Sequence, residues 1–464
     1  MDGINPANVS GINRNPSKGV PFIRDENKEV KAAEPKDEVT LQSLLKCRPQ
    51  DLSSDGKIGV IIKAENSEQL KQIKEKLAEN PRNTIKVDLP LINGFAAELD
   101  PSSKGILPDL SKNVGDIKIF LDGKVSLIEP VEKFDNDMHI MMDVAGKTMG
   151  IDKVWEKGFK GKGVTICIID TGIAPHADIK SRVIAFKDFV GGKEGVENMY
   201  DDHGHGTHCA GIAAGDGTES KGKYMGVAPE ASLVGVKVLG TSGGTFSDVI
   251  AGIQWAVKQK EEGKLPIDII SMSLGSSTYE SYKDNPVAQA VEAAVAKGII
   301  VTVAAGNSGP GRETISTPAN APHVITVGAM DDKGTLTRDD DTIASFSSRG
   351  PTPYDNLPKP DVLTPGVRIT APRVGGGYTT MSGTSMACPF MAGASALIKN
   401  AAPLVTPGEL KGVVMGTGKP LASGEDHNQQ GAGVVNIAQA IEKLTGMVIE
   451  PPSPPPPKDS QPPK

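Results

Sequence analysis

The sequence predicts an α/β protein in which a small α+β unit precedes a larger three-layer domain with a central, mainly parallel sheet. From about residue 148, short apolar segments alternate with helical patterns. Continuous apolar strands separated by helices are typical of a parallel sheet that is covered on both faces. Between residues 41 and about 130, shorter strand and helix patterns indicate a separate unit. A chain of 464 residues is long enough for both.

In the larger domain, strands are predicted from runs of apolar residues at 164–169, 232–238, 267–272, 299–304 and 324–327. Between them, residues 249–258 and 286–296 have apolar side chains at helical spacing. In sheets of this kind, sites form at the carboxyl ends of the strands. The polar residues that follow these strands are therefore the first candidates for function.

In the small unit, residues 57–63 form the first predicted strand. Asn66 then opens a helix with apolar residues at 70, 73 and 77. Residues 92–99 form a second strand. Residues 117–121 and 124–128 are expected to pair as a hairpin, with a type I′ turn at Asp122-Gly123. This order predicts a split βαβ sandwich of the ferredoxin-like kind.

The termini and the overall charge argue against several classes of function. The net charge of −7 gives no sign of a basic surface for nucleic acid or anionic membranes, which weakens a nucleic-acid function without excluding it. No stretch of about 18 apolar residues is present to span a bilayer, and the N-terminus lacks the pattern of a signal peptide. Residues 1–40 are expected to be disordered, and residues 449–464 to form a Pro-rich tail.

Three segments combine residue types that suit nucleophilic catalysis. Asp170 directly follows a predicted strand, His205 begins an Ala-rich helix, and Ser385 precedes a long apolar run where a helix N-terminus would favour negative charge. Each has a simpler interpretation when taken alone. Asp170 could close a loop, and Ser385 could be an N-cap. His203, His205 and His208 could be read as a zinc cluster, although no carboxylate or cysteine at suitable spacing completes it.

Taken together, the segments Asp170-Thr-Gly, His205-Gly-Thr-His-Cys-Ala-Gly and Gly383-Thr-Ser-Met-Ala-Cys-Pro resemble the subtilisin family of serine proteases, in the family's order of Asp, His and Ser. Further family-like stretches extend the resemblance over about residues 148–445. The resemblance implies a subtilisin-like catalytic domain and a serine endopeptidase that hydrolyses peptide bonds through an acyl-enzyme. Asp170, His205 and Ser385 would be its triad, and no cofactor would be required for chemistry.

The resemblance also assigns supporting roles around the triad. Asn307 and the Ser385 backbone N–H would form the oxyanion hole. Ser273, Leu274 and Gly275 would pair with an extended polypeptide substrate, and Gly243 and Phe246 would form the opposite edge. Ala304, Ala305 and Ser316 would line the first specificity pocket. Because this set includes no acidic residue, we expect a broad preference for apolar or medium-sized P1 residues.

The small unit resembles the inhibitor-type pro-domain of secreted relatives, through 93–99 and 125–130. The resemblance implies a pro-domain at 41–140 that assists folding and inhibits the enzyme in cis, and a catalytic domain at 141–448. Self-cleavage is expected near 130–145, and the product is expected to be a monomer. The resemblance favours an extracellular location, whereas the bare N-terminus favours the cytoplasm, so the sequence leaves the location open.

Some features depart from the family or stay open. Structural calcium has no support in the sequence: Asp178 could be one ligand, but a surface carboxylate is the simpler interpretation. Pro389 is expected in the first turn of its helix. Cys209 and Cys388 lie near the catalytic residues and are expected to be buried, unpaired thiols. An inactive pseudoprotease, or a peptide ligase on the same fold, would keep the same architecture.

Overall fold

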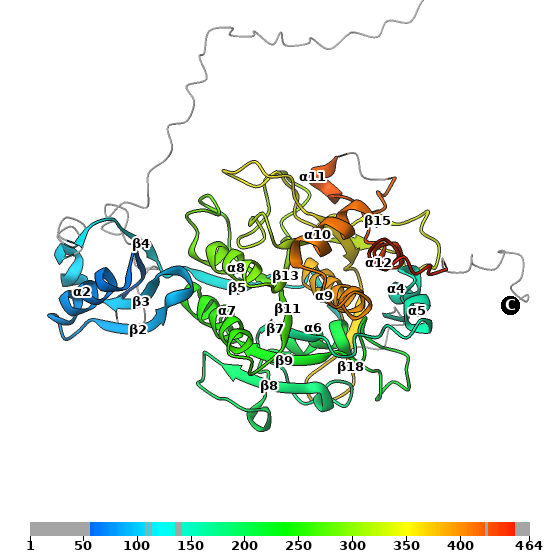
Figure 1. The fold of residues 1–464 in the computed structure, drawn as a ribbon, viewed down its shortest axis with the longest axis horizontal. Helices are drawn as coiled ribbons and strands as arrows, with labels where there is room; N and C mark the ends of the chain where they lie inside the picture. Colours follow the sequence, from blue (N-terminus) through cyan, green and yellow to red (C-terminus); the bar gives the residue numbers. More distant parts are fainter. Residues whose placement is uncertain (1–55, 107–109, 111–113, 135–141, 423–425, 451–464) are drawn as a thin grey trace, which may run out of the picture.

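In the computed structural model, residues 56–106, 110, 114–134, 142–422 and 426–450 are described. The predicted disordered segment at 1–40 and the Pro-rich residues from 451 onward lie outside these ranges. Within the described ranges, no helix has both the length and the apolarity needed to cross a bilayer. A small N-terminal unit lies beside one larger domain (Figure 1).

The small unit is a four-stranded antiparallel sheet with strand order β2-β3-β1-β4. Its elements are β1 (Ile58–Ala64), α2 (Ser67–Ala78), β2 (Thr84–Leu89), β3 (Gly94–Leu99) and β4 (Ile117–Leu121). Strand β3 lies between β1 and β2, which confirms the split βαβ order. Asn66 caps α2 and forms a capping box with Gln69, as expected of a helix that begins there.

The strand pattern of the small unit differs from the prediction in two places. Strand β3 begins at Gly94, because Pro90–Ile92 forms a 3₁₀ turn and Asn93 adopts φ 52°. Strand β2 was not predicted, since its side chains are mostly exposed and its apolar pattern is weak.

The predicted hairpin between residues 117–121 and 124–128 is wrong. Strand β4 pairs with β1, whereas β5 (Lys124–Leu127) leaves the small unit and pairs with two strands of the larger domain (Figure 1). These strands are β10 (Gly244–Thr245) and β12 (Leu274–Gly275). Gly123 lacks the positive φ of a type I′ turn, but it lies close to the side chain of Phe246. A Cβ atom there would lie 3.0 Å from the ring of Phe246.

The larger domain is built on an eight-stranded sheet, which is parallel except for one short edge pairing. Its strand order is β15-β14-β13-β11-β7-β9-β8, with β16 also beside β14. The strands are β7 (Thr165–Asp170), β8 (Val183–Asp188), β9 (Ser232–Lys237), β11 (Ile267–Met272), β13 (Ile300–Ala304), β14 (Ile325–Asp331), β15 (Thr342–Ile343) and β16 (Val362–Pro365). The mainly parallel sheet predicted from the apolar strands is therefore confirmed.

Helices cover both faces of this sheet. Alternate residues of β7 belong to different cores: Ile166 and Ile168 pack with residues of α6 (His205–Ala214) and α9 (Thr384–Ala401). Cys167 and Ile169 pack with residues of α7 (Phe246–Glu261) and α8 (Pro286–Ala296). The remaining helices are α4 (Met142–Thr148), α5 (Ile151–Glu156), α10 (Pro407–Gly416), α11 (His427–Gln430) and α12 (Ile437–Thr445). The sheet and its two helical layers form the predicted three-layer arrangement.

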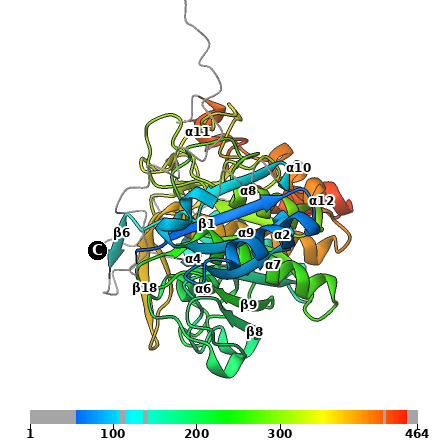
Figure 2. The ribbon, with the colours of Figure 1, turned by 90° about the vertical axis from the view of Figure 1, so that its left-hand side faces the viewer.

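The sheet of the small unit packs on the larger domain through α7 and α8. Figure 2 shows β1 and α2 in front of these helices. Ile61, Leu89 and Phe120 share one apolar core with residues of α7 and α8, and α2 covers the other face of the small sheet. Polar contacts reinforce the packing: the carboxylate of Asp122 accepts from Ser247 N at 2.8 Å and Ser247 Oγ at 2.7 Å, at the start of α7. A carboxylate is favoured at a helix N-terminus.

Beyond β5, the chain continues across the larger domain and forms β6 (Glu132–Phe134). Strand β6 pairs antiparallel with β18 (Tyr378–Ser382), which forms a hairpin with β17 (Ile369–Pro372). Residues 124–134 therefore pair with three segments of the larger domain in succession. The segment between β5 and β6 passes directly over Ser385.

Candidate active site

The three predicted catalytic side chains lie at the ends of elements that meet at one edge of the central sheet. Asp170 is the last residue of β7, His205 is the first residue of α6, and Ser385 is the second residue of α9. All three are buried. His205 Nδ1 lies 2.8 Å from Asp170 Oδ1, within hydrogen-bond distance. Cys209 Sγ lies 3.8 Å from His205 Nδ1 and 3.5 Å from Ser385 O, so one thiol touches both.

Short-range contacts fix His205 against Asp170. Gly206 N donates to Thr171 Oγ1 at 2.9 Å, next to Asp170 in the chain. A Cβ atom at position 206 would lie 2.1 Å from Gly172 O, so only glycine permits this approach. The sequence reasoning missed Asp201. Its carboxylate accepts from the backbone N–H of residues 203, 204 and 207, and so it holds the start of α6.

The electrostatics of His205 reflect two opposing effects. Burial alone would lower the pKa of His205, since it disfavours the charged ring. The charge of Asp170 and its hydrogen bond raise it, and the net result is a His205 pKa well above the usual 6.5. The Asp170–His205 pair therefore favours the imidazolium form.

Ser385 lies in the first turn of α9, where backbone N–H groups face outward. The N-cap of α9 is Gly383, which provides no side-chain cap, so Ser385 is not an N-cap. The Ser385 hydroxyl donates to Ile128 O at 2.6 Å. His205 Nε2 is buried and has no hydrogen-bond partner. Pro389 lies inside the helix, one turn later than expected, because α9 begins already at Thr384.

The Asn307 side chain is oriented by a residue that the sequence reasoning missed. Asn307 Oδ1 accepts from both Thr384 N and Thr384 Oγ1 at 2.9 Å. The amide nitrogen is thereby turned toward the crossing segment and donates to Glu129 O at 2.7 Å. Asn307 thus presents a fixed donor close to Ser385, which is the geometry that an oxyanion site needs.

The two predicted substrate-binding edges flank β5. Ser126 lies opposite Gly275 and Leu127 opposite Leu274 in an antiparallel ladder, and Ile128 N donates to Ser273 O at 3.4 Å. On the other side, Gly244 pairs with Val125. Gly243 approaches the same strand closely, since a Cβ atom there would lie 2.7 Å from Val125 O. Phe246 N donates to Gly123 O at 2.8 Å.

Of the three predicted pocket residues, Ala304 packs directly with Ile128. Ile128, Ala304 and Cys388 form one buried apolar cluster. Ser316 Oγ donates to Ala305 O at 3.3 Å, which places these two residues together. Cys388 was not assigned to this pocket from the sequence.

The thiols near the site are protonated and unpaired. Cys167, Cys209 and Cys388 are buried and free, while Cys47 lies outside the described residues. Burial raises the pKa of Cys209, and it raises the pKa of Cys388 to about 11. A neutral thiol is a poor nucleophile, so neither cysteine competes with Ser385.

The described residues do not support a zinc cluster of three histidines. Ligand atoms close enough to share a metal ion come from Asp170, His205 and Cys209, and no such group includes His203 or His208. Two of these ligand atoms, Asp170 Oδ1 and His205 Nδ1, are already hydrogen-bonded to each other. His208 Nε2 instead lies 3.1 Å from Thr379 O.

The described contacts of Asp178 add no support for a calcium site. Asp178 is fully buried, so its interpretation as a surface carboxylate is wrong. Its Oδ1 accepts from Glu219 N at 2.8 Å, and its Oδ2 accepts from Tyr378 O–H at 2.7 Å. Each carboxylate oxygen therefore already accepts a hydrogen bond from the protein, and among the described residues no group of three His, Cys, Asp or Glu ligands includes Asp178.

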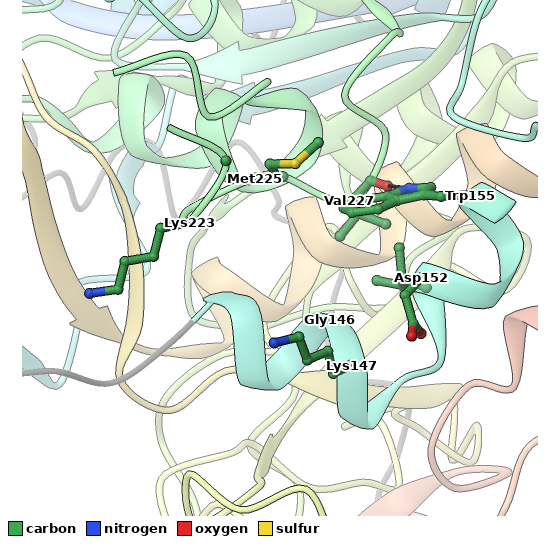
Figure 3. Close-up of a pocket in the computed structure, with 10 residues that line it drawn as sticks. Gly146, Lys147, Asp152, Trp155, Lys223, Met225 and Val227 are labelled. Atoms are coloured by element: carbon green, nitrogen blue, oxygen red, sulfur yellow. Dashed lines mark hydrogen bonds between the residues drawn. The ribbon is translucent and has the colours of Figure 1, made fainter. Parts of the chain in front are cut away.

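A separate pocket of about 170 Å³ lies between α4, α5 and residues 222–227. Figure 3 shows Trp155 beside Val227, and the indole Nε1 donates to Val227 O at 3.0 Å. None of the predicted site residues lines this pocket. The polar groups with fixed geometry lie instead around Ser385, which makes that region the candidate site.

Comparison with known proteins places this geometry among serine proteases. The model of the subtilase family matches residues 161–433. The chain is 42% identical over 387 residues to serine protease AprX of Bacillus subtilis, covering 79% of this chain and 83% of AprX. It is 38% identical over 296 residues to subtilisin DY of Bacillus licheniformis, covering 63% of this chain and 95% of that protein.

A solved structure shares the fold. Fervidolysin from Fervidobacterium pennivorans, described as a keratinolytic enzyme related to subtilisin, superposes with a TM-score of 0.67 at 21% identity. The match covers 85% of this chain and 62% of fervidolysin, so the chain spans about three fifths of that protein.

Proposed function

Because this chain belongs to the subtilase family of serine proteases, we propose that it is an endopeptidase whose triad is Asp170, His205 and Ser385, made as a precursor inhibited by its own N-terminal unit. The observation that carries the proposal is the convergence at one sheet edge of the Asp170–His205 pair, the Ser385 hydroxyl and the oriented Asn307 amide. These are the groups that acyl transfer requires.

In the proposed mechanism, His205 acts as the general base. It takes the Ser385 proton at Nε2 while Ser385 Oγ attacks the peptide carbonyl, and it then gives that proton to the leaving amine. Water hydrolyses the acyl-enzyme by the same proton route. Asp170 holds the imidazole through Nδ1 and stabilises its charged form, in accord with the raised pKa of His205.

Asn307 would stabilise the oxyanion together with the Ser385 backbone N–H. Its amide is held before reaction by the two hydrogen bonds to Thr384, so little reorganisation is needed as charge develops. Loss of one such donor costs about 3–4 kcal/mol in subtilisin.

The N-terminal unit is well placed to act as an inhibitor. Strand β5 completes a three-stranded antiparallel sheet with β10 and β12, the two edges proposed to bind substrate. The Asp122–Ser247 contact and the apolar packing on α7 and α8 anchor the unit outside these edges. A substrate therefore has to displace a strand that is held from several sides.

The pocket around Ile128 supports an apolar P1 preference. We expect peptides with Leu, Ile or Met at P1 to be cut with kcat/KM about tenfold or more above otherwise identical peptides with Lys or Asp, because Ala304 and Cys388 provide no partner for a charge. Kinetics on a matched tetrapeptide series measure this. A preference for Lys would contradict the pocket assignment.

A direct test of the proposed function is covalent labelling of the processed enzyme with a fluorophosphonate. We expect one adduct, mapped to Ser385 by peptide mass spectrometry, and activity that survives a strong metal chelator, because the nucleophile is a serine activated by a histidine. Labelling after acid denaturation is the control, and should give no adduct. Loss of casein hydrolysis with chelator and no label at Ser385 would refute the proposal.

A further inference from the structure

We infer that residues 128–131 cross the catalytic centre in a register in which neither peptide bond beside Ser385 can be cut, and that Pro130 holds them in this register. The inference rests on the proposed function, since it concerns how the same site acts on its own junction. Three sets of contacts carry it.

The first contact set concerns the two carbonyl groups near Ser385. One of them contacts the Ser385 hydroxyl and the other contacts the Asn307 amide, whereas a scissile carbonyl must contact both. In acyl transfer, one carbonyl carbon faces the nucleophile while its own oxygen accepts from the oxyanion donors. Here the Ile128 oxygen accepts from Ser385 Oγ at 2.6 Å, but the Asn307 amide donates to the Glu129 oxygen at 2.7 Å. The carbonyl beside the nucleophile therefore lacks the Asn307 donor.

The second contact set concerns the proton of Ser385. A hydroxyl has one hydrogen to donate, and Ser385 donates it to Ile128 O. His205 Nε2, the atom that has to accept this proton, is left without a partner. The bound segment thus diverts the nucleophile from its base.

The third contact set shows that the crossing segment has little freedom to rearrange. Ile128 N is bound to Ser273 O at 3.4 Å on one side, and Val131 N to Ser382 O at 2.7 Å on the other. Only Glu129 and Pro130 lie between these anchors. The ring of Pro130 fixes its own φ and also restricts Glu129 to extended conformations. The Ile128 oxygen cannot replace the Glu129 oxygen at Asn307 unless an anchor breaks.

The bond that already presents its carbonyl to Asn307 is the Glu129–Pro130 bond. Its nitrogen belongs to the proline ring, which places a carbon where an ordinary peptide carries hydrogen. That carbon crowds the side from which His205 has to protonate the leaving nitrogen. Processing therefore waits until the segment shifts and the Ile128 oxygen reaches Asn307.

After this shift, the Ile128–Glu129 bond is the one that breaks. Ser385 Oγ bonds to the Ile128 carbon while its proton moves to His205. The carbon–nitrogen bond then breaks as His205 returns the proton to Glu129 N, which becomes the new N-terminus. Water releases Ile128 as a carboxylate and restores Ser385. This position lies just before the predicted range of 130–145.

The test is the rate and position of self-cleavage in the full chain, followed by intact-mass and N-terminal analysis after refolding. We expect Pro130→Ala to process at least about fivefold faster than the parent, because a backbone restriction is removed. We also expect a second product that begins at position 130, since the bond already at Asn307 becomes an ordinary amide. The parent should yield a single product that begins at Glu129.

Controls separate this inference from simpler explanations. Pro101→Ala removes an exposed proline of the small unit away from the crossing segment and should process at the parent rate. Insertion of one glycine between Glu129 and Pro130 lengthens the span and should also accelerate cleavage, which guards against a folding defect in a single variant. Equal rates for the parent, Pro130→Ala and the insertion overturn the inference, as does a parent product that begins at position 130.

The same experiment distinguishes failure of the inference from failure of the proposed function. If the parent digests casein but neither Pro130→Ala nor the glycine insertion accelerates self-cleavage, the inference about the register is refuted and the proposed protease is not. A parent that neither processes itself nor digests casein refutes the proposed protease.

Discussion

Replacing Ser385 by alanine is expected to leave the chain at its full mass of 48.5 kDa and to lower kcat on casein by about 10⁶-fold, the magnitude known for this change in subtilisin. In the proposed mechanism the hydroxyl is the attacking group, and the two neighbouring thiols are buried with raised pKa values, so they are poor substitutes for it. Intact-mass analysis over time and casein hydrolysis measure the two effects.

A matched control for this change is Ser395→Ala on the same helix. Ser395 is also buried, and its hydroxyl donates to Met391 O at 2.9 Å within α9. This variant should process and digest like the parent. If Ser385→Ala processed and digested like the parent too, the serine mechanism would have to be abandoned.

Asp170→Asn is expected to lower kcat by about 10⁴-fold, as the same change does in a trypsin-type enzyme, because the wrong imidazole tautomer is held. It should also move the acid limb of the pH profile. In the proposed mechanism the neutral imidazole is the base, so activity should fall as pH drops through the pKa of His205. Asp170 raises that pKa well above 6.5. The parent's acid limb should therefore lie above pH 6.5, and the variant's limb should lie at lower pH than the parent's.

The pH profile of kcat/KM on a peptide substrate, measured with processed enzyme, checks this shift. Asp188→Asn is a suitable control, because Asp188 is another buried aspartate at the end of a strand, where it accepts from Val190 N and Gly191 N. It should leave the acid limb unchanged. A parent whose rate stayed flat from pH 5 to 9 would argue against His205 as the base, provided that chemistry limits the rate.

Sequence patterns predicted the central sheet and the positions of Asp170, His205 and Ser385, because each depends on local signals. Continuous apolar strands specify a buried parallel sheet, and a polar residue directly after such a strand has to lie at its carboxyl edge. The start of α9 followed in the same way from an apolar run behind Gly383. Short-range periodicity is sufficient for elements of this kind.

Contacts between distant segments could not be predicted from these patterns. Residues 124–128 alternate as a hairpin strand would, but the partners of β5 lie more than a hundred residues away. Asp178 looked like a surface carboxylate until Tyr378 and Glu219 were placed against it. No sequence pattern at Thr384 indicates that it orients the Asn307 side chain. Asp201 lies just before the helix that begins at His205. Aspartate is favoured near helix N-termini, so the sequence did contain a signal for the role of Asp201.

The covalent continuity between β4 and β6 has a thermodynamic consequence for the proposed activation. In the proposed precursor, β5 would compete with substrate at the millimolar effective concentration of a short tether, whatever the protein concentration. Once the backbone is cut, the same strand belongs to a separate molecule and its occupancy follows ordinary mass action. Latency before the cut is thus independent of dilution, whereas latency after the cut is lost on dilution.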